Sequence, residues 1–319
     1  MKVVGVSRFG GPEALRVFEV PEPHAGPGEV RIRVHAATVN PGDTVLRAGE
    51  LDLGARRPPY IPGMEAAGIV DEIGEGAVTG LRAGDAVMAF VMPLRPEGGA
   101  YTEYLALPAD WVAPAPSGAS HAESAGLPMN GLTARLAVDV LGLSPGQVLA
   151  VTGAAGSVGG YAVQMAKADG LRVIADASPA DAGLVRSLGA DVTVARGTDV
   201  AARFREAAPG GVDGLVDAAV IGTARLAGAV RDGGGIAVVR EEGRHAADPG
   251  ELARREIARH PVFVPEYLGD QARLGRLRAQ AESGTLTLRV ARTFPAEQAA
   301  DAHRLLEAGG IRGRMVLEF

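Results

Sequence analysis

The sequence predicts a mixed α/β protein with two domains, one a doubly wound parallel sheet and the other an antiparallel, barrel-like β domain. From Val148 onward, apolar strand-like runs alternate with helical patterns, which is typical of a parallel sheet covered on both faces. Before residue 115, short runs alternate apolar and polar residues between Gly and Pro, which is typical of antiparallel strands. With 319 residues, the chain is long enough for two cores.

The N-terminal part contains three clear strand patterns, at Val30–Ala36, Gly68–Gly74 and Asp85–Phe90. After Pro114–Gly118 the composition changes, and Ser120–Leu141 is rich in alanine with helical spacing. We therefore expect the first domain to end near residue 118.

The second domain has strand and helix patterns in strict alternation. The helix after residue 177 has clear start signals, with Ser178 as N-cap and Pro179 at the first position. The expected strands are Val148–Val151, Leu171–Ala175, Asp191–Ala195, Gly214–Ala218 and Gly235–Arg240, and the expected helices are 158–169, 178–189, 199–207 and 221–231.

Beyond residue 258 the alternation weakens. We expect a strand at Thr285–Val290, a helix at Ala296–Ala308 and a closing strand at Arg314–Phe319. These elements are expected to return to the N-terminal domain, which gives domain ranges of 1–118 with 259–319, and 119–258.

The strand at Val148 runs into a glycine-rich turn that opens a helix, and this is the strongest functional signal. Ala154 occupies the first place of the G-x-G-x-x-G pattern, while Gly156 and Gly159 occupy the other two. Such a turn lets a diphosphate approach the backbone and the free N–H groups of the helix. It predicts dinucleotide binding by a run of seven residues, Gly153, Ala154, Ala155, Gly156, Ser157, Val158 and Gly159.

Composition excludes several classes of function. The net charge of −6 and the absence of basic clusters give no reason to expect nucleic acid binding. No apolar stretch is long enough to span a membrane and no signal peptide is indicated, so we expect a cytoplasmic protein. The chain has no cysteine, and its six histidines lack metal-ligand spacing, so neither a disulfide nor a metal site is expected.

Several motifs in order resemble the medium-chain dehydrogenase/reductase superfamily, and within it the zinc-free quinone oxidoreductase, zeta-crystallin-like branch. The resemblance runs nearly end to end. It implies a GroES-like catalytic β-barrel domain joined to a Rossmann nucleotide-binding domain. The motifs are Phe9–Leu15, Val34–Asp43, Pro62–Val70, Gly131–Ala134 and the glycine-rich turn Ala154–Gly159.

The zinc-dependent branch of this superfamily normally has a cysteine near residues 38–40 and a His-Glu pair where Met64 and Glu65 stand here. Both zinc-bearing positions are lost. The resemblance therefore implies hydride transfer to a quinone or an α,β-unsaturated carbonyl without metal.

The same resemblance suggests Asn40 and Thr133 as catalytic residues that also contact the cofactor. The alternatives are that Asn40 only forms a turn before Pro41 and that Thr133 is only a hydroxyl at a helix start. Relatives often have a tyrosine where Val45 stands, so a proton donor is missing there and water is a candidate source. Tyr60 could reach the cleft from the following loop, but it is interpreted as an exposed loop residue.

The choice of nicotinamide cofactor depends on three residues after the second and third strands. Asp176 would bind a ribose diol and favour NADH, but aligned without gaps it falls one residue before the diol-binding acid of the zinc branch. Ser178 and Arg196 would instead hold the 2′-phosphate of NADPH. We predict NADPH, with NADH as the alternative.

Two other functions stay open at this point: a catalytically silent NADPH-binding protein, crystallin-like or regulatory, and a biosynthetic tailoring enoyl reductase. The resemblance also implies a homodimer that pairs through an edge strand, for which Ile236–Arg240 and Val262–Val264 are candidates.

Overall fold

Short runs that alternate apolar and polar residues pair into an antiparallel sheet in the N-terminal part of the chain. The structure is a computed structural model that describes residues 1–240 and 245–319. Its contacts divide the chain into a first unit, Met1–Met129 with Tyr267–Ser283 and Leu288–Phe319, and a second unit, Asn130–Glu266 with Gly284–Thr287. Residues 119–129 therefore group with the N-terminal strands, and residues 259–266 with the parallel sheet.

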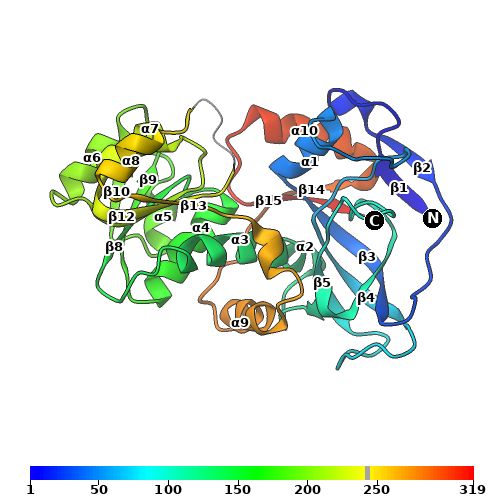
Figure 1. Cartoon of the computed structure of the whole chain (residues 1–319). Coiled ribbons are helices and arrows are strands. Elements are labelled where there is room, and N and C mark those ends of the chain that lie inside the picture. The colour runs from blue at the N-terminus through cyan, green and yellow to red at the C-terminus, as the bar shows by residue number, and fades with distance from the viewer. Residues whose placement is uncertain (241–244) are drawn as a thin grey trace. The chain divides into compact units, whose positions relative to one another are not determined.

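The described residues of the first unit form a seven-stranded sheet in the order β14-β15-β3-β4-β5-β7, with β6 also paired to β3 (Figure 1). A separate hairpin pairs β1 with β2. The three N-terminal strands expected from the sequence are present, which confirms the barrel-like domain. The strands are β1 (Lys2–Gly5), β2 (Arg16–Glu19), β3 (Glu29–Val39), β4 (Glu65–Ile73), β5 (Ala86–Phe90), β6 (Tyr104–Pro108), β7 (Val112–Pro114), β14 (Val290–Pro295) and β15 (Arg314–Glu318).

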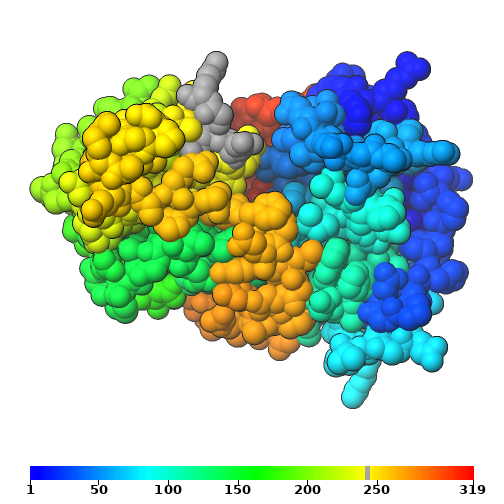
Figure 2. All heavy atoms as spheres, in the orientation of Figure 1, coloured from blue at the N-terminus to red at the C-terminus, as the bar shows by residue number. Residues whose placement is uncertain are grey.

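The C-terminal segment completes this unit. Strand β15 runs antiparallel to β3, with Met315 opposite Val39. Helix α10 (Ala299–Ala308) contacts the short helix η1 (Pro12–Ala14), and Figure 2 shows the red C-terminal segment beside the blue N-terminal one. The other helices of the unit are α1 (Pro41–Ala48), α2 (His121–Ala125) and α9 (Gln271–Glu282).

The strand expected at Thr285–Val290 is wrong, because the chain becomes a strand only at Val290. The N–H of Thr287 donates to Oε1 of Gln164 at 2.8 Å, within the second unit. This donor is therefore not available to a sheet in the first unit.

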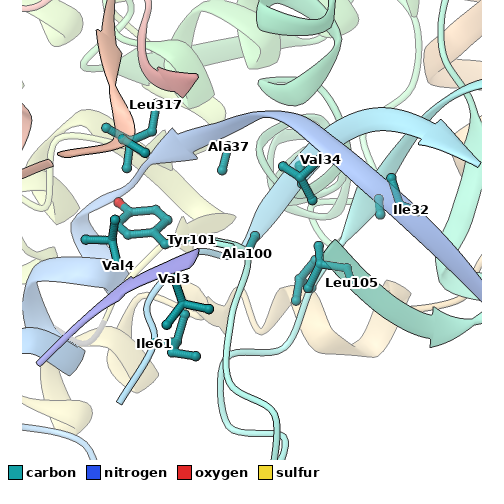
Figure 3. Packing of buried hydrophobic residues seen from close by; sticks show 14 of the residues in the cluster. Val3, Val4, Ile32, Val34, Ala37, Ile61, Ala100, Tyr101, Leu105 and Leu317 are labelled. Atoms are coloured by element: carbon teal, nitrogen blue, oxygen red, sulfur yellow. The ribbon is translucent and has the colours of Figure 1, made fainter. Parts of the chain in front are cut away.

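The core of the first unit lies between its strands and the returning C-terminal segment. Side chains from β1, β3, β6 and β15 meet around the ring of Tyr101, which is fully buried (Figure 3). The apolar face of β3 alternates as the sequence predicts, with Val30, Ile32 and Val34 inside.

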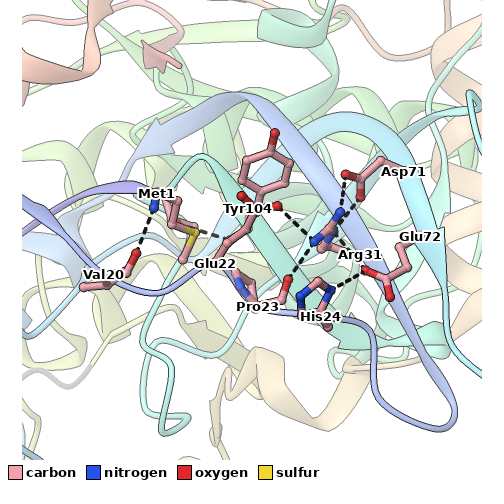
Figure 4. Close-up of polar contacts among 10 residues, drawn as sticks. Met1, Val20, Glu22, Pro23, His24, Arg31, Asp71, Glu72 and Tyr104 are labelled. Carbon is pink, nitrogen blue, oxygen red and sulfur yellow. Dashed lines mark hydrogen bonds and ion pairs between the residues drawn. The ribbon is translucent and has the colours of Figure 1, made fainter.

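Arg31, on the opposite face of β3, joins three chain segments near the surface. Its guanidinium pairs with Asp71 of β4 at 2.9 Å and with Glu22 at 3.0 Å, and it lies over the ring of Tyr104 (Figure 4). It also donates to the carbonyl of Pro23 at 2.9 Å. These contacts fix the segment before β3 against β4 and β6.

The second unit contains a six-stranded parallel sheet in the order β10-β9-β8-β11-β12-β13. This order reverses beside β8, as in the doubly wound fold that the alternating pattern predicts. The strands are β8 (Val148–Thr152), β9 (Arg172–Ala177), β10 (Val192–Ala195), β11 (Val212–Asp217), β12 (Val230–Val238) and β13 (Ala258–Pro261).

Helices cover both faces of this sheet (Figure 1). One face buries Ala150, Ile174 and Leu215 against Phe204 and Leu226. The other face packs on α4. The helices of the unit are α3 (Pro128–Asp139, from Asn130 onward), α4 (Ser157–Ala168), α5 (Ala182–Ser187), α6 (Val200–Ala207), α7 (Thr223–Leu226) and α8 (Pro249–Arg254).

Three details of the second unit differ from the sequence prediction. The regular part of helix α5 begins at Ala182, one turn later than predicted, although the Ser178 hydroxyl accepts the Asp181 N–H, which is the N-cap bond expected of Ser178. The helix expected at 221–231 stops at Ala229, where β12 begins. The Ile236 segment is not an edge, because β12 pairs with both β11 and β13.

Within residues 1–240 and 245–319, no helix combines the length and the apolar character that crossing a membrane requires.

Candidate functional site

A tight turn joins the central strand β8 to helix α4. Gly153 follows the strand with φ +65°, a left-handed conformation that glycine adopts without strain. The Gly156 N–H donates to the Gly153 carbonyl at 2.9 Å, and α4 then starts at Ser157. The first N–H groups of the helix therefore lie at the carboxyl end of β8.

The turn leaves no room for larger residues. A β-carbon on Gly159 would lie 2.3 Å from the carbonyl oxygen of Gly153, and one on Gly156 would lie 3.1 Å from the same atom. Glycine at position 159 is thus what allows α4 to approach the turn.

The hydroxyl of Ser157 indicates what the turn binds. Its Oγ is buried, and no residue that the structure describes forms a hydrogen bond with it. A buried polar atom of this kind needs a partner. A diphosphate oxygen at the N-terminus of α4 would supply one, so the turn fits the diphosphate of a dinucleotide.

Asp176 lies near the end of β9, and its carboxylate faces the turn. It is 6% exposed, and its Oδ1 accepts the N–H of Ala154 at 3.3 Å. Burial raises the pKa of Asp176, while the N–H groups of Ala154 and Gly153 and the charge of Arg196 oppose that rise. The side chain is therefore directed at the protein backbone.

Ser178 and Arg196 follow the ends of two neighbouring strands. Ala177 of β9 is paired with Ala195 of β10, so the next residue on each strand lies at the same edge of the sheet. The Arg196 side chain is exposed, and the Ser178 hydroxyl donates to Asp181 at 2.6 Å. The pair forms a small polar edge beside Asp176.

Asn40 lies at the N-cap of α1, in the first unit, and it is 1% exposed. Its Nδ2 donates to Oγ1 of Thr38 at 2.9 Å and is 3.4 Å from Oε1 of Glu65. Thr38 donates to the same Glu65 oxygen at 2.5 Å, and the other oxygen accepts the Met129 N–H at 2.9 Å. Asn40 therefore belongs to a buried polar cluster.

Asp43 connects this cluster to a second loop. Its Oδ2 accepts the N–H of Asn40 at 2.8 Å, and its Oδ1 accepts the N–H of Gly63 at 2.8 Å. The two loops joined in this way are the ones that precede α1 and β4, so Asp43 positions both Asn40 and Glu65.

Thr133 lies in the first half of α3 and is 5% exposed. It belongs to the second unit, whereas Asn40 belongs to the first. It is an interior residue of its helix and not a start residue, because α3 begins at Pro128.

Tyr60 is half-buried, so its interpretation as an exposed loop residue is wrong. Its ring stacks on that of Phe9, with centroids 4.9 Å apart and 18° between the planes. The hydroxyl donates to the carbonyl of Arg56 at 3.3 Å. The stacking partner, which lies between β1 and β2, covers part of this ring.

The chain is similar to known proteins along nearly its whole length. The model of the alcohol dehydrogenase GroES-like domain matches residues 26–117, and that of the zinc-binding dehydrogenase matches residues 188–317. An NADPH-dependent alkenal/one oxidoreductase of Arabidopsis thaliana chloroplasts is 31% identical over 99% of this chain and 79% of its own length. The quinone oxidoreductase of Sus scrofa is 28% identical over 99% of this chain and 97% of its own.

The chain belongs to the medium-chain dehydrogenase/reductase superfamily. Its relatives place it in the quinone oxidoreductase, zeta-crystallin-like branch, as the motifs predicted, and the protein is an oxidoreductase. Solved structures of the superfamily confirm the GroES-like and Rossmann domains. One described as an NAD-dependent alcohol dehydrogenase has a TM-score of 0.89 and 31% identity over the whole of both chains. A mycobacterial protein in complex with NADPH has a TM-score of 0.87 and 29% identity, again over both whole chains.

Membership in this superfamily supports a nicotinamide nucleotide as the cofactor class. Within the described ranges, no three His, Cys, Asp or Glu side chains are grouped as metal ligands. Thr38 and Asn40, from the segment where the zinc-dependent branch was expected to have a cysteine, bind Glu65 directly.

Sequence analysis missed the bridging role of Asp43 in this medium-chain reductase. A signal was present, because Asn and Asp three residues apart match the spacing of a capping box. The contact to Gly63 had no local signal, since it joins residues 20 positions apart.

Proposed function

We propose that the protein is a zinc-independent, NADPH-dependent reductase of quinones or α,β-unsaturated carbonyls. The observation that carries the cofactor choice is the orientation of Asp176. Its carboxylate is buried against the N–H of Ala154, so it is not presented to a ribose diol.

The polar edge beside Asp176 supports the same choice. Arg196 and Ser178 lie at adjacent strand ends, and a guanidinium and a hydroxyl suit a phosphate monoester. In this proposal the turn from Gly153 to Gly159 binds the diphosphate, with the Ser157 hydroxyl and the first N–H groups of α4 as donors.

The nicotinamide, when bound, supplies a hydride to an electron-poor carbon conjugated to a carbonyl. Negative charge then develops on the carbonyl oxygen of the substrate, where a fixed donor lowers the barrier. We propose Asn40 as that donor. The amide nitrogen is held 2.9 Å from Oγ1 of Thr38 and 3.4 Å from Oε1 of Glu65, which fixes the direction of its N–H groups. Water supplies the proton.

Two relatives, which are 28% and 31% identical to this chain, support this substrate class, since they are named quinone oxidoreductase and alkenal/one oxidoreductase. We propose that Thr133 contacts the cofactor from α3. A homodimer and a cytoplasmic location remain predictions from the sequence. The edge strands of the described parallel sheet are β10 and β13 (Ala258–Pro261), and Val262–Val264 directly follows β13.

The test compares kcat/KM for NADPH and NADH with a panel of quinones and enones. We expect turnover with NADPH preferred. Replacing Arg196 by Ala should raise KM for NADPH about tenfold and leave KM for NADH unchanged, because only the former has the 2′-phosphate.

Arg172→Ala is the matched control, because Arg172 begins β9 and lies at the opposite, amino-terminal edge of the sheet. A preference for NADH in the unmodified protein would overturn the cofactor assignment. Nucleotide binding without oxidation of NADPH by any acceptor would support the catalytically silent alternative instead.

A further inference from the structure

A buried row of polar side chains ends at Asp43 in the first unit. The Tyr101 hydroxyl lies 3.3 Å from Oδ2 of Asp43 and 3.1 Å from Nε2 of His303. Nδ1 of His303 is 3.3 Å from Nη1 of Arg47, whose Nη2 pairs with Glu307 at 2.5 Å. These side chains come from the loop after β5, from α10 and from α1.

The row crosses an apolar core. Tyr101 and His303 are 0% exposed, Asp43 is 1% exposed, and Figure 3 shows the Tyr101 ring among Val4, Ala100 and Leu317. Only Glu307 reaches the surface, with 41% of its side chain exposed. Buried polar groups cost stability compared with apolar ones of similar shape, so a complete row of this length calls for a reason.

Each hydrogen bond in this row has a defined donor and acceptor, from Arg47 at one end to Asp43 at the other. Burial, together with the charge of Arg47, lowers the pKa of His303 to about 3, so the ring is neutral near pH 7. Arg47 can only donate, so Nδ1 of His303 accepts and Nε2 has the proton. Nε2–H then donates to the Tyr101 oxygen, and the Tyr101 hydroxyl donates to Asp43.

Asp43 thus receives three donors: the Tyr101 hydroxyl and the N–H groups of Asn40 and Gly63. The hydroxyl orients the carboxylate so that each oxygen faces one backbone N–H. Through these bonds, the row fixes the loop that presents Asn40 and the loop that leads to Glu65.

We propose that Tyr101 and His303 are positioning residues, which hold Asn40 in the geometry that substrate reduction requires; this inference rests on the proposed role of Asn40. They touch neither substrate nor cofactor. They act through Asp43, and a displacement of Asn40 by about 1 Å is enough to slow catalysis severely.

The test compares Tyr101→Phe with Tyr104→Phe. The first removes one hydroxyl from the row and retains the ring in the core. The second removes a hydroxyl for which the described structure has no hydrogen bond, and Figure 4 shows that hydroxyl directed away from Arg31. We expect kcat per folded molecule to fall about tenfold in Tyr101→Phe, with KM for NADPH unchanged, and no change in Tyr104→Phe.

A second pair of variants separates positioning from packing. His303→Gln retains an N–H donor for Tyr101 and an acceptor for Arg47, whereas His303→Leu retains neither. We expect His303→Gln to keep kcat within about threefold and His303→Leu to lose about tenfold. If His303→Leu only lowers Tm while its kcat per folded molecule stays normal, the row is structural and the proposal is wrong.

The pH profile gives a readout that packing alone would not change. Burial raises the pKa of Asp43 to about 7, against the Asn40, Gly63 and Tyr101 donors, so kcat should decline as the pH falls below about 7. Losing the Tyr101 donor should move this inflection to higher pH. The ionisable groups facing the row are Glu65, Arg47, Arg314, Tyr101 and His303.

Failure of the two proposals can be told apart. If the unmodified protein reduces no acceptor, the proposed function fails. Hydrogen exchange of the backbone N–H groups of Asn40 and Gly63 then tests the polar row alone. Tyr101→Phe should speed this exchange at both residues about tenfold. If the unmodified protein is active and Tyr101→Phe has the same kcat and the same pH profile, only the positioning proposal fails.

Discussion

Asn40 is the residue where the polar cluster of the first unit meets the proposed chemistry. Its backbone N–H binds Asp43, and its side-chain amide binds Thr38 and lies near Glu65. A residue that is fixed at both its backbone and its side-chain amide is a better donor to a developing charge than a mobile one, because it does not have to reorganise during the reaction.

Replacing Asn40 by Asp should lower kcat about 100-fold, since Asp retains the shape but has no amide N–H to offer an anionic oxygen. KM for NADPH should not change. Steady-state kinetics with one quinone and one enone measures both quantities. Equal kcat values for Asn40→Asp and the unmodified protein would remove Asn40 from the mechanism.

At this scale the sequence predicts residue type better than orientation. The conformation of the glycine-rich turn was predictable, because Gly153 has a positive φ and Gly159 packs too closely on the backbone for a β-carbon. The direction of the Asp176 carboxylate was not, because it depends on whether the side chain faces the turn or the solvent. The partners of Tyr101 were also hidden, since His303 lies 202 residues away in sequence.

Among the elements, α4 is the one whose position depends most on a single residue. Gly159→Ala should destabilise the protein by about 1–3 kcal/mol, because the new methyl group would collide with the backbone of Gly153. Nucleotide binding should weaken as well, since α4 would shift away from the turn.

The matched control is Gly183→Ala in α5, where a β-carbon would meet no atom within 4 Å. This variant should gain up to about 1 kcal/mol from helix propensity. Urea unfolding monitored by circular dichroism measures both changes. If both variants have the same stability, the close approach at Gly159 has no energetic importance.

Element types were more predictable than element ends. The parallel strands appeared where apolar runs alternate with helices. Helix α5 begins at Ala182 although the Ser178 hydroxyl accepts the Asp181 N–H as an N-cap residue does, and β14 begins only at Val290, after Thr287 has bonded to Gln164. Sequence periodicity does not report such bonds.

For the whole molecule, two buried groups make the pH dependence of stability unusual. The pKa of Asp43 is raised to about 7, so the folded chain retains on Asp43 a proton that the unfolded chain loses near pH 3.8. The contribution of Asp43 to stability is therefore lost as the pH rises toward 7. The pKa of His303, lowered to about 3, means that its contribution is lost as pH falls below 6.5. Between pH 4 and 6.5 the two effects oppose each other.

Removing one group should expose the other. In His303→Gln the free energy of unfolding should rise on acidification from pH 6.5 to 4, relative to the unmodified protein, by up to about 1.4 kcal/mol per pH unit. Asp43→Asn should show the reverse slope. Urea unfolding at three pH values in this range measures both slopes, and three parallel profiles would contradict the assignment.

The architecture as a whole was predictable because periodicity changes between the two halves of the chain. What the sequence could not reveal is that residues 284–287 group with the second unit, although α9 before them and β14 after them group with the first. Such a division depends on tertiary contacts and leaves no local pattern.

The pairing of Met315 with Val39 has a consequence for biosynthesis. During translation, all strands of the parallel sheet have been synthesised once β13 has emerged from the ribosome. Strand β15, which pairs with β3, and His303, which contacts Tyr101, are synthesised later. A nascent chain would thus acquire the means to bind a nucleotide before Asn40 is fixed.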